Sequence, residues 1–359
     1  MTGVQTCALP ISLLDRRRRA LSLAALAGLC APGVALAQAA PRQVEDSAGR
    51  RVRVPPRVQR VFPAGPPAAI WLYTLAPEAL LGWPRANRPE EVEFLLPGIG
   101  SRPEVGRLTG RGNTANLETV LALKPDLIVD TGSVRQTFVE LADRVQQQTG
   151  IPYALIDGAL EAVPAGYRLL GELMGVRERA EGLARYAEDA LRQVRERVAG
   201  VPRERHPRVY YARGPHGLET GLDGSINVEM FEAMGIELVS TRMPGGLARV
   251  SIEQVLNWDP EVIITIDQSF AQSAAQSPLW RNVSAVKNGR VHLSPKLPFG
   301  WVDFPPSVNR LPGLWWIGAK VFPERFREDL GEVARDFYRR FYQVDLSAAQ
   351  VQRVLAGRD

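Results

Sequence analysis

The stretch NLETVLALKPDLI, from Asn116 to Ile128, decides the fold because a second copy, SIEQVLNWDPEVI, runs from Ser251 to Ile263. The copies align at a constant offset of 135 residues and share a glutamate, a Val-Leu pair, a proline and a final isoleucine. Each copy is typical of a short helix that begins at a capping Asn or Ser, ends before a proline and leads into a buried strand. The spacing is far wider than the roughly 20–50 residues of solenoid repeats. It predicts two similar lobes with a ligand cleft between them.

Short apolar runs alternate with helical stretches around each copy, which predicts a parallel α/β sheet in each lobe. The segment Arg42–Pro56 alternates polar and apolar residues around a central turn and predicts a β-hairpin. Between the lobes, Val176–Val198 carries one apolar stripe at helical spacing, which predicts a connecting helix of about 35 Å. The strands are predicted at 60–62, 80–83, 127–129 and 153–156 in the first lobe, and at 208–211, 235–239, 262–266 and 290–293 in the second.

The N-terminal segments are set apart from the fold. Residues 1–11, MTGVQTCALPI, are similar to a translated sequencing adapter. Residues 12–37 combine an arginine run, an apolar stretch and a small-x-small motif, so we predict a signal peptide cleaved near Ala37 and a periplasmic protein. General secretory and twin-arginine export both remain open. The remaining chain divides into an N-terminal lobe (42–175), an interlobe helix (176–200) and a C-terminal lobe with C-terminal helices (205–359).

Charge and cysteine content exclude several classes of protein. Both cysteines, Cys7 and Cys30, precede the predicted cleavage site, so the mature chain is expected to fold without disulfides. The first 37 residues carry four arginines and one aspartate, so the formal charge of +5 falls by three to +2. No basic tract remains that would indicate nucleic-acid binding. With three histidines and no remaining cysteine, neither a transition-metal cage nor a cofactor is expected.

Five sequence blocks in order resemble the iron-chelate and cobalamin class of periplasmic substrate-binding proteins of ABC importers. They are DSAGRRVRVP (Asp46–Pro55), the two repeat copies, AVKNGRVHLSP (Ala285–Pro295), and Pro298–Trp301 followed by Leu314-Trp315-Trp316. The resemblance covers about residues 42–356. It implies two α/β lobes joined by one long helix, as in other chelatase-like, helical-backbone binding proteins. It also implies a monomeric, non-catalytic solute receptor that delivers its ligand to an inner-membrane permease.

The shared glutamates of the repeat, Glu118 and Glu253, have two interpretations. Each follows a capping residue, where a carboxylate interacts favourably with the helix dipole by about 0.3–1 kcal/mol. The resemblance implies a second role, in which one glutamate from each lobe docks on arginines of the permease. We expect docking for both residues.

Ligand residues are expected in the loops after the strands, because ligands of α/β lobes bind outside the carboxyl ends of strands. The resemblance adds the Trp301 loop and the stretch Pro244–Arg249. Arginine side chains pair bidentately with carboxylates and oxyanions, so Arg213 and Arg249 indicate an anionic ligand, to which Arg102 or Arg111 would add charge. The predicted ligand-binding residues are Gly65, Pro66, Ser133, Arg213, Arg249, Gln268 and Trp301.

The expected ligand is an anionic iron chelate, such as a carboxylate- or catecholate-bearing ferric siderophore. Haem, molybdate or tungstate, and a cobamide remain alternatives. A rival class is an enzyme or metallochaperone on the same fold, but HExxH, G-x-S-x-G, Walker A and dinucleotide-binding glycine patterns do not occur in the sequence.

Overall fold

The computed structural model describes residues 2–3, 40–110, 112, 114–241 and 243–358. Apart from Thr2 and Gly3, the predicted adapter-derived segment and signal peptide therefore lie outside the described residues. Residues 41–359 form one compact unit. Within the described residues, no helix has both the length and the apolar character needed to cross a membrane.

The first lobe contains a parallel sheet in the order β3-β4-β5, as the sequence predicts. The predicted hairpin forms from two antiparallel strands. The elements of this lobe are β1 (Arg42–Glu45), β2 (Arg51–Val54), β3 (Val61–Pro63), α2 (Pro66–Leu75), α3 (Pro89–Val92), α4 (Leu117–Ala122), β4 (Leu127–Gly132), α5 (Gln136–Thr149), β5 (Tyr153–Asp157) and α6 (Val163–Met174).

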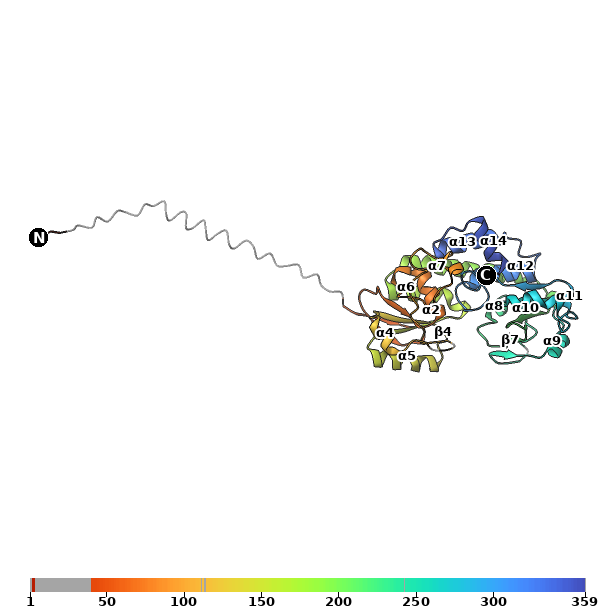
Figure 1. Ribbon diagram of the computed structural model, residues 1–359, viewed down its shortest axis with the longest axis horizontal. Coiled ribbons are helices and arrows are strands. Elements are labelled where there is room, and N and C mark those ends of the chain that lie inside the picture. Colours follow the sequence, from red (N-terminus) through yellow and green to blue (C-terminus); the bar gives the residue numbers. More distant parts are fainter. Residues whose placement is uncertain (1, 4–39, 111, 113, 242, 359) are drawn as a thin grey trace. The chain divides into compact units, whose positions relative to one another are not determined.

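The second lobe repeats this plan with a parallel sheet in the order β6-β9-β10. Its elements are β6 (Val209–Ala212), β7 (Glu219–Gly221), α8 (Glu229–Ala233), β8 (Leu247–Arg249), α9 (Ile252–Trp258), β9 (Val262–Thr265), α10 (Gln268–Ser273), α11 (Ser284–Lys287) and β10 (Val291–Leu293). The C-terminal helices α12 (Arg310–Val321), α13 (Leu330–Phe337) and α14 (Ala348–Ala356) follow. Figure 1 shows α13 and α14 together, away from α4, α5 and α9.

Two predicted strands are not strands in the structure. At 80–83, only Leu80 pairs with the sheet, through one bridge to Val61, because the chain then turns to pair Trp83 with Glu104. At 235–239, Leu238 forms one bridge to Val209. The two exceptions occupy equivalent places in the two lobes, so each sheet ends in the same way.

Side chains of the central strands alternate between two hydrophobic cores, as the period of two in a strand requires. In β4, Leu127 and Val129 join the core shared with the helices, whereas Ile128 packs with α5 on the other face. In β9, Val262 and Ile264 join the shared core and Ile263 faces the other way. Both sheets are thus covered on both faces, which is typical of parallel sheets.

The repeat is anchored in the same way in both lobes. The backbone N–H of Asp126 donates to the carbonyl of Arg60 at 2.8 Å, and Glu261 donates to Arg208 at the same distance. Each arginine side chain in turn donates to carbonyls at the end of the repeat helix, Arg60 to Lys124 at 3.1 Å and Arg208 to Asp259 at 2.9 Å. These contacts hold the C-terminal end of each repeat helix beside the start of its sheet.

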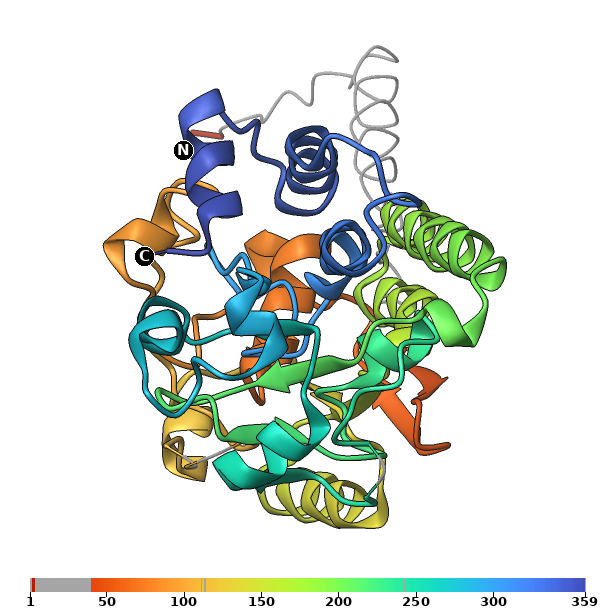
Figure 2. The same cartoon turned by 90° about the vertical axis from the view of Figure 1, so that its right-hand side faces the viewer.

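Helix α7 (Arg177–Ala199) lies between the two lobes in sequence and packs along α6 and against α12. Its apolar stripe is buried, as predicted, from Ala180 to Val198. Figure 2 shows this green helix beside the blue α12. Two similar α/β lobes joined by one long helix are thus confirmed.

A buried arginine also joins the lobes. The Arg310 guanidinium, at the start of α12, donates to the Glu229 carboxylate at 2.9 Å and to the carbonyl of Gly158 at 2.5 Å. The same Glu229 carboxylate accepts the N–H of Leu160 at 2.9 Å. Because Gly158 and Leu160 follow β5 while Glu229 belongs to α8, this network connects the two lobes directly.

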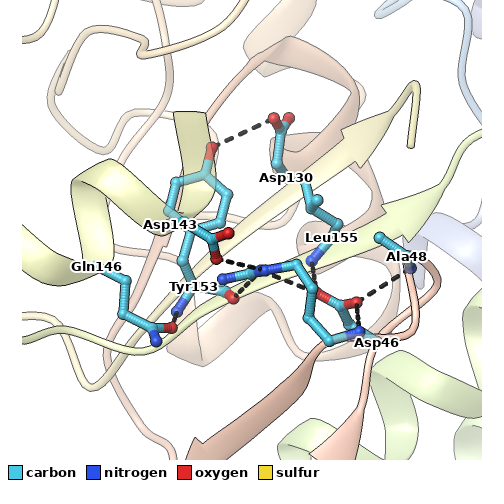
Figure 3. Close-up of polar contacts among 8 residues, drawn as sticks. Asp46, Ala48, Asp130, Asp143, Gln146, Tyr153 and Leu155 are labelled. Atoms are coloured by element: carbon cyan, nitrogen blue, oxygen red, sulfur yellow. Dashed lines mark hydrogen bonds and ion pairs between the residues drawn. The ribbon is translucent and has the colours of Figure 1, made fainter. Parts of the chain in front are cut away.

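A second polar network attaches the hairpin to the first sheet. The Asp46 carboxylate accepts the N–H groups of Ala48 and Leu155 at 3.0 and 3.1 Å. Figure 3 shows these contacts, together with the Tyr153 hydroxyl that donates to Asp130 at 3.2 Å. Asp130 is buried on β4 and also accepts a hydrogen bond from Thr109 at 3.0 Å. Burial raises the pKa of Asp130 to about 6, although these hydrogen bonds partly oppose the shift.

We predict that Gly171→Val destabilises the protein by about 1–3 kcal/mol, because it overpacks the α6–α7 contact. A Cβ at Gly171 would lie 2.2 Å from the Cβ of Ala180. Gly182→Ala is the matched control, since a Cβ there meets nothing within 4 Å and alanine favours the helix by about 1 kcal/mol. Urea unfolding measures both variants. Equal free energies of unfolding for the two variants would contradict the close contact between Gly171 and Ala180.

We further predict that Asp130 makes the fold less stable as pH rises. Its folded pKa of about 6 exceeds the unfolded value of about 3.9, so the folded state holds the extra proton between these values. The free energy of unfolding should fall by about 2–3 kcal/mol as pH rises from 4 to 7. Asp130→Asn should remove this decrease in the free energy of unfolding, which urea unfolding at pH 4 and at pH 7 measures. Asp143→Asn, at a side chain that is 61% exposed, should retain it. If the free energy of unfolding of Asp130→Asn still falls to the same extent between pH 4 and pH 7, Asp130 is not the source of the decrease.

Candidate ligand-binding cleft

A cleft of about 650 Å³ lies between the two lobes. Its second-lobe wall is built from residues that follow the carboxyl ends of β6, β9 and β10, where α/β folds place ligands. Its first-lobe wall comes from α3 and the loop before it. The residues lining the cleft are Arg85, Ala86, Arg88, Glu91, Arg213, Gly214, Glu219, Ile266, Asp267, Lys296, Pro298, Phe299 and Phe304.

Arg213 lines this cleft and has unused hydrogen-bonding capacity. The residue is only 9% exposed, and its Nε and Nη1 atoms are buried without a hydrogen-bond partner. The nearest acidic oxygen, Oδ2 of Asp303, lies 3.4 Å from Nε. That oxygen already accepts hydrogen bonds from the Tyr211 hydroxyl at 2.8 Å and the Asn227 amide at 2.7 Å. Arg213 is therefore charge-balanced but has two donors without acceptors among the described residues.

Asp303 also holds an exposed aromatic side chain. Its Oδ1 accepts the N–H of Phe304 at 2.6 Å, and Phe304 has a positive φ of 66°. Such a backbone conformation is unfavourable for a bulky residue and persists only where its surroundings impose it. Phe304 is 74% exposed and lines the cleft, so the Asp303 loop positions both a cation and an aromatic ring.

The first-lobe wall contains two arginines that share one buried carboxylate. Arg85 binds Glu91 through two hydrogen bonds of 2.8 and 2.7 Å, and the Nε of Arg88 donates to it at 3.1 Å. Burial acts to raise the pKa of Glu91, but these arginine contacts outweigh burial and hold it below its ordinary value. Four cations and three carboxylates line the whole cleft, so its charge is nearly balanced. An anionic ligand would therefore depend on Arg213 for a charge partner.

The expected residues of the loops after β3 and β4 lie outside the main cleft lining. Gly65 caps α2, and a Cβ there would lie 2.7 Å from the Thr109 hydroxyl. Pro66 lines a small extension of about 40 Å³ that shares Arg85 and Phe299 with the main cleft. Ser133, after β4, accepts hydrogen bonds from Arg135 through its hydroxyl.

The other expected residues fall in three environments. Gln268 begins α10, directly after the cleft residue Asp267. The Arg249 side chain is 81% exposed, and its Nε lies 4.0 Å from Oε1 of Glu219. Arg249 lines a separate pocket of about 390 Å³. Trp301, expected as a cleft wall, is fully buried in the shared core, and Phe299 and Phe304 from the same loop line the cleft.

Among the described residues of the first lobe, the arginines that line the cleft are Arg85 and Arg88 rather than the expected Arg102. Arg102 donates to the carbonyls of Pro77 and Glu78 at 3.0 and 3.1 Å, and Arg111 lies outside the described residues. Arg85, Arg88 and Lys296 were not expected. Lys296 follows β10 closely, so the strand-end rule applied to that strand would have found it. Arg85 and Arg88 lie near a short helix in a region without a clear sequence pattern.

The described residues contain no group of three or more His, Cys, Asp or Glu side chains that would hold a metal ion. The polar groups of the cleft instead suit an ionised organic or inorganic ligand.

Comparisons with known proteins agree with this architecture. A family model described as "Periplasmic binding protein" matches residues 107–297. An ABC transporter solute binding protein from Sulfurospirillum deleyianum is 30% identical, with a TM-score of 0.79 over 87% of this chain and 98% of that one. A periplasmic solute binding protein from Veillonella parvula is 25% identical, with a TM-score of 0.73 over 88% of this chain and 96% of that one.

Two relatives are named for a ligand. The molybdate-binding protein MolA of Haemophilus influenzae is 25% identical over 267 residues, which cover 67% of this chain and 74% of that protein. A haem uptake protein, IsdE of Staphylococcus aureus, is 22% identical over 67% of this chain and 83% of its own length. These relatives are substrate-binding proteins rather than enzymes. The chain belongs to the periplasmic binding protein family, among the solute-binding proteins of ABC transporters.

Proposed function

We propose that this protein is a periplasmic, monomeric, non-catalytic receptor that binds an anionic iron chelate in its interlobe cleft and delivers it to an inner-membrane permease. A ferric siderophore with carboxylate or catecholate groups fits this description. The observation that carries the proposal is the buried Arg213 guanidinium, whose Nε and Nη1 lack hydrogen-bond partners at the edge of the cleft. A ligand oxyanion would supply them.

The size and lining of the cleft support a bulky ligand. Clefts of about 300–1,000 Å³ are typical of organic ligands, and this cleft measures about 650 Å³. Phe299 and Phe304 add aromatic surface beside the cations. We place Arg213, Gln268, Gly65 and Pro66 close to the ligand. Ser133, Arg249 and Trp301 would reach it only after rearrangement of their loops.

Molybdate is the second candidate because a 25% identical relative is named a molybdate-binding protein. Small oxyanions are usually held by converging backbone N–H groups. Pro66 and Pro67 open α2 and carry no N–H, while Asp267 already accepts the N–H groups of Ser269 and Phe270. These two helix starts therefore offer few free donors, which favours the larger chelate.

We predict that Arg213→Gln weakens binding of the anionic chelate about 10–100-fold, because charged hydrogen bonds contribute about 1.5–3 kcal/mol. Arg249→Gln is the control and should change affinity less, since its side chain is largely exposed. Tryptophan-fluorescence titration with ferric citrate, a ferric tris-catecholate, haem, cobalamin, molybdate and tungstate measures affinity. Tight binding of molybdate but of no chelate would overturn the ligand class. Catalytic turnover of any substrate that is lost in Arg213→Gln would contradict the proposal that the protein is a non-catalytic receptor.

We also predict that Glu118→Gln combined with Glu253→Gln impairs transport while leaving chelate affinity nearly unchanged. Both glutamates lie near the N-termini of α4 and α9, and neither lines the cleft. Uptake of the radiolabelled chelate into cells, compared with the titration above, separates docking from binding. Loss of chelate affinity in a folded double variant would show that these residues serve the ligand site.

A further inference from the structure

A second cavity, of about 390 Å³, lies in the second lobe outside the interlobe cleft. Its walls come from the β6–β7 loop, the end of β8, α10 and the segment after α10, and Figure 1 shows β7 and α10 in the same lobe. Its size is typical of sites for small organic ligands. Among the described residues, its lining shares none with the cleft. The lining residues are Pro215, His216, Leu218, Arg249, Val250, Phe270, Ser273, Ser277, Leu279 and Trp280.

The apolar part of this pocket is aromatic. Phe270 and Trp280 are almost completely buried and meet edge to face, with their ring centroids 4.6 Å apart. Leu218 and Val250 are half-buried and pack against the same core. Leu279 is 57% exposed and adds apolar surface that still faces solvent. The pocket therefore presents aromatic and aliphatic surface to a ligand.

The β6–β7 loop that forms one wall is held in place by its own contacts. Gly214 and Gly217 have positive φ values of 75° and 70°, and the N–H of Gly217 donates to the carbonyl of Gly214 at 2.9 Å. The Tyr210 hydroxyl donates to the Gly217 carbonyl at 2.9 Å. A Cβ at Gly217 would lie 2.4 Å from the Phe270 ring, so only glycine allows this approach. A wall fixed in this way lowers the cost of ordering the site when a ligand binds.

The charged and ring-nitrogen groups of the pocket favour an anion. No aspartate or glutamate is among the described residues that line it. The guanidinium of Arg249 lines the pocket, and the Oε1 of Glu219 lies 4.0 Å from its Nε, too far for a hydrogen bond. The exposed imidazole of His216 carries at least one N–H donor. A guanidinium pairs well with a carboxylate, so the charge of the pocket complements a carboxylate ligand.

We propose that this pocket is a second ligand site, which takes a small aromatic carboxylate. The ring of the ligand lies against Phe270 and Trp280, and its carboxylate pairs with Arg249. The cleft differs in both respects, because it is larger and its cations are nearly balanced by carboxylates.

The two sites lie on either side of one loop. Arg213 and Gly214 line the cleft, whereas Pro215 and His216, the next two residues, line the pocket. The pocket is thus separate from the buried guanidinium that carries the proposed function. Binding to the pocket and binding to the cleft can therefore be measured independently.

The test is calorimetric titration of the mature chain with 3-phenylpropionate, and with 3-phenylpropanol as its uncharged counterpart. The wild type should bind one equivalent of 3-phenylpropionate, and Arg249→Gln should weaken this about three- to tenfold, a modest loss because solvent screens an exposed guanidinium. Arg281→Gln is the matched control, since Arg281 is exposed beside Trp280 but does not line the pocket, and it should bind normally. Equal affinity for the two compounds, or for the two variants, would overturn the inference.

A second pair of variants tests the position of the ligand. Ser273 is exposed on α10 and lines the pocket, so Ser273→Phe should fill the pocket and abolish binding of 3-phenylpropionate. Gln272→Phe places the same ring on the same helix at an exposed residue outside the lining, and it should bind normally. Circular dichroism checks that both variants are folded. Retained binding in folded Ser273→Phe would overturn the inference. Dimerisation that Ser273→Phe abolishes, measured by sedimentation, would assign this surface to a second copy of the chain instead.

Titration of the same variants with the iron chelate separates this inference from the proposed function. Ser273→Phe and Gln272→Phe should both bind ferric citrate or the ferric tris-catecholate as the wild type does. If Arg213→Gln weakens 3-phenylpropionate as much as Arg249→Gln does, the probe occupies the cleft, and this inference falls while the proposed function stands. If the wild type binds 3-phenylpropionate at the pocket but binds no chelate, the proposed function falls and this inference stands.

Discussion

The guanidinium of Arg310 is the contact on which the arrangement of the two lobes depends. It is fully buried, and burial lowers its pKa, although Glu229 opposes this shift. A buried charge is tolerated only when it is paired, and removal of one partner typically costs about 3–5 kcal/mol. Here the partners come from both lobes, Glu229 from one and the Gly158 carbonyl from the other. Together with α7, this pairing sets the spacing of the two sheets and hence the width of the cleft.

The cleft itself carries an energetic cost in the unliganded protein. Each buried donor without a partner destabilises the fold by about 1–3 kcal/mol, and Arg213 has two such donors. Asp303 limits this cost by balancing the charge, but its oxygens are occupied by Tyr211, Asn227 and the N–H of Phe304. A ligand oxyanion would therefore remove an existing penalty as well as form new contacts. The loop that holds Asp303 also fixes the exposed ring of Phe304, so charge and aromatic surface are coupled.

The sequence predicted the elements that carry a clear apolar pattern and missed those that depend on packing between distant segments. The two copies of the helix-proline-strand pattern were enough to predict both lobes, because buried apolar residues at fixed spacing determine strands and short helices. Arg213 was found from its place after a strand. Arg85 and Arg88 were missed because α3 is short and carries no periodic signal. Trp301 was expected in the cleft since its loop lies there, but only packing decides which aromatic of a loop turns inward. The segments at Leu80 and Leu238 show the same limit, because each forms only a single bridge to its sheet.

The repeat helices α4 and α9 are exposed in the same pattern, from Asn116 to Ala122 and from Ser251 to Asn257, and this match has a kinetic consequence. A partner with true two-fold symmetry meets the same pair of helices in either of two orientations, half a turn apart. The cleft lies between the lobes that carry these helices, so either orientation brings the same two lobes to the partner. Half of the rotational search that normally slows the association of two proteins is then unnecessary. A receptor built from two similar lobes would thus gain productive encounters without gaining affinity.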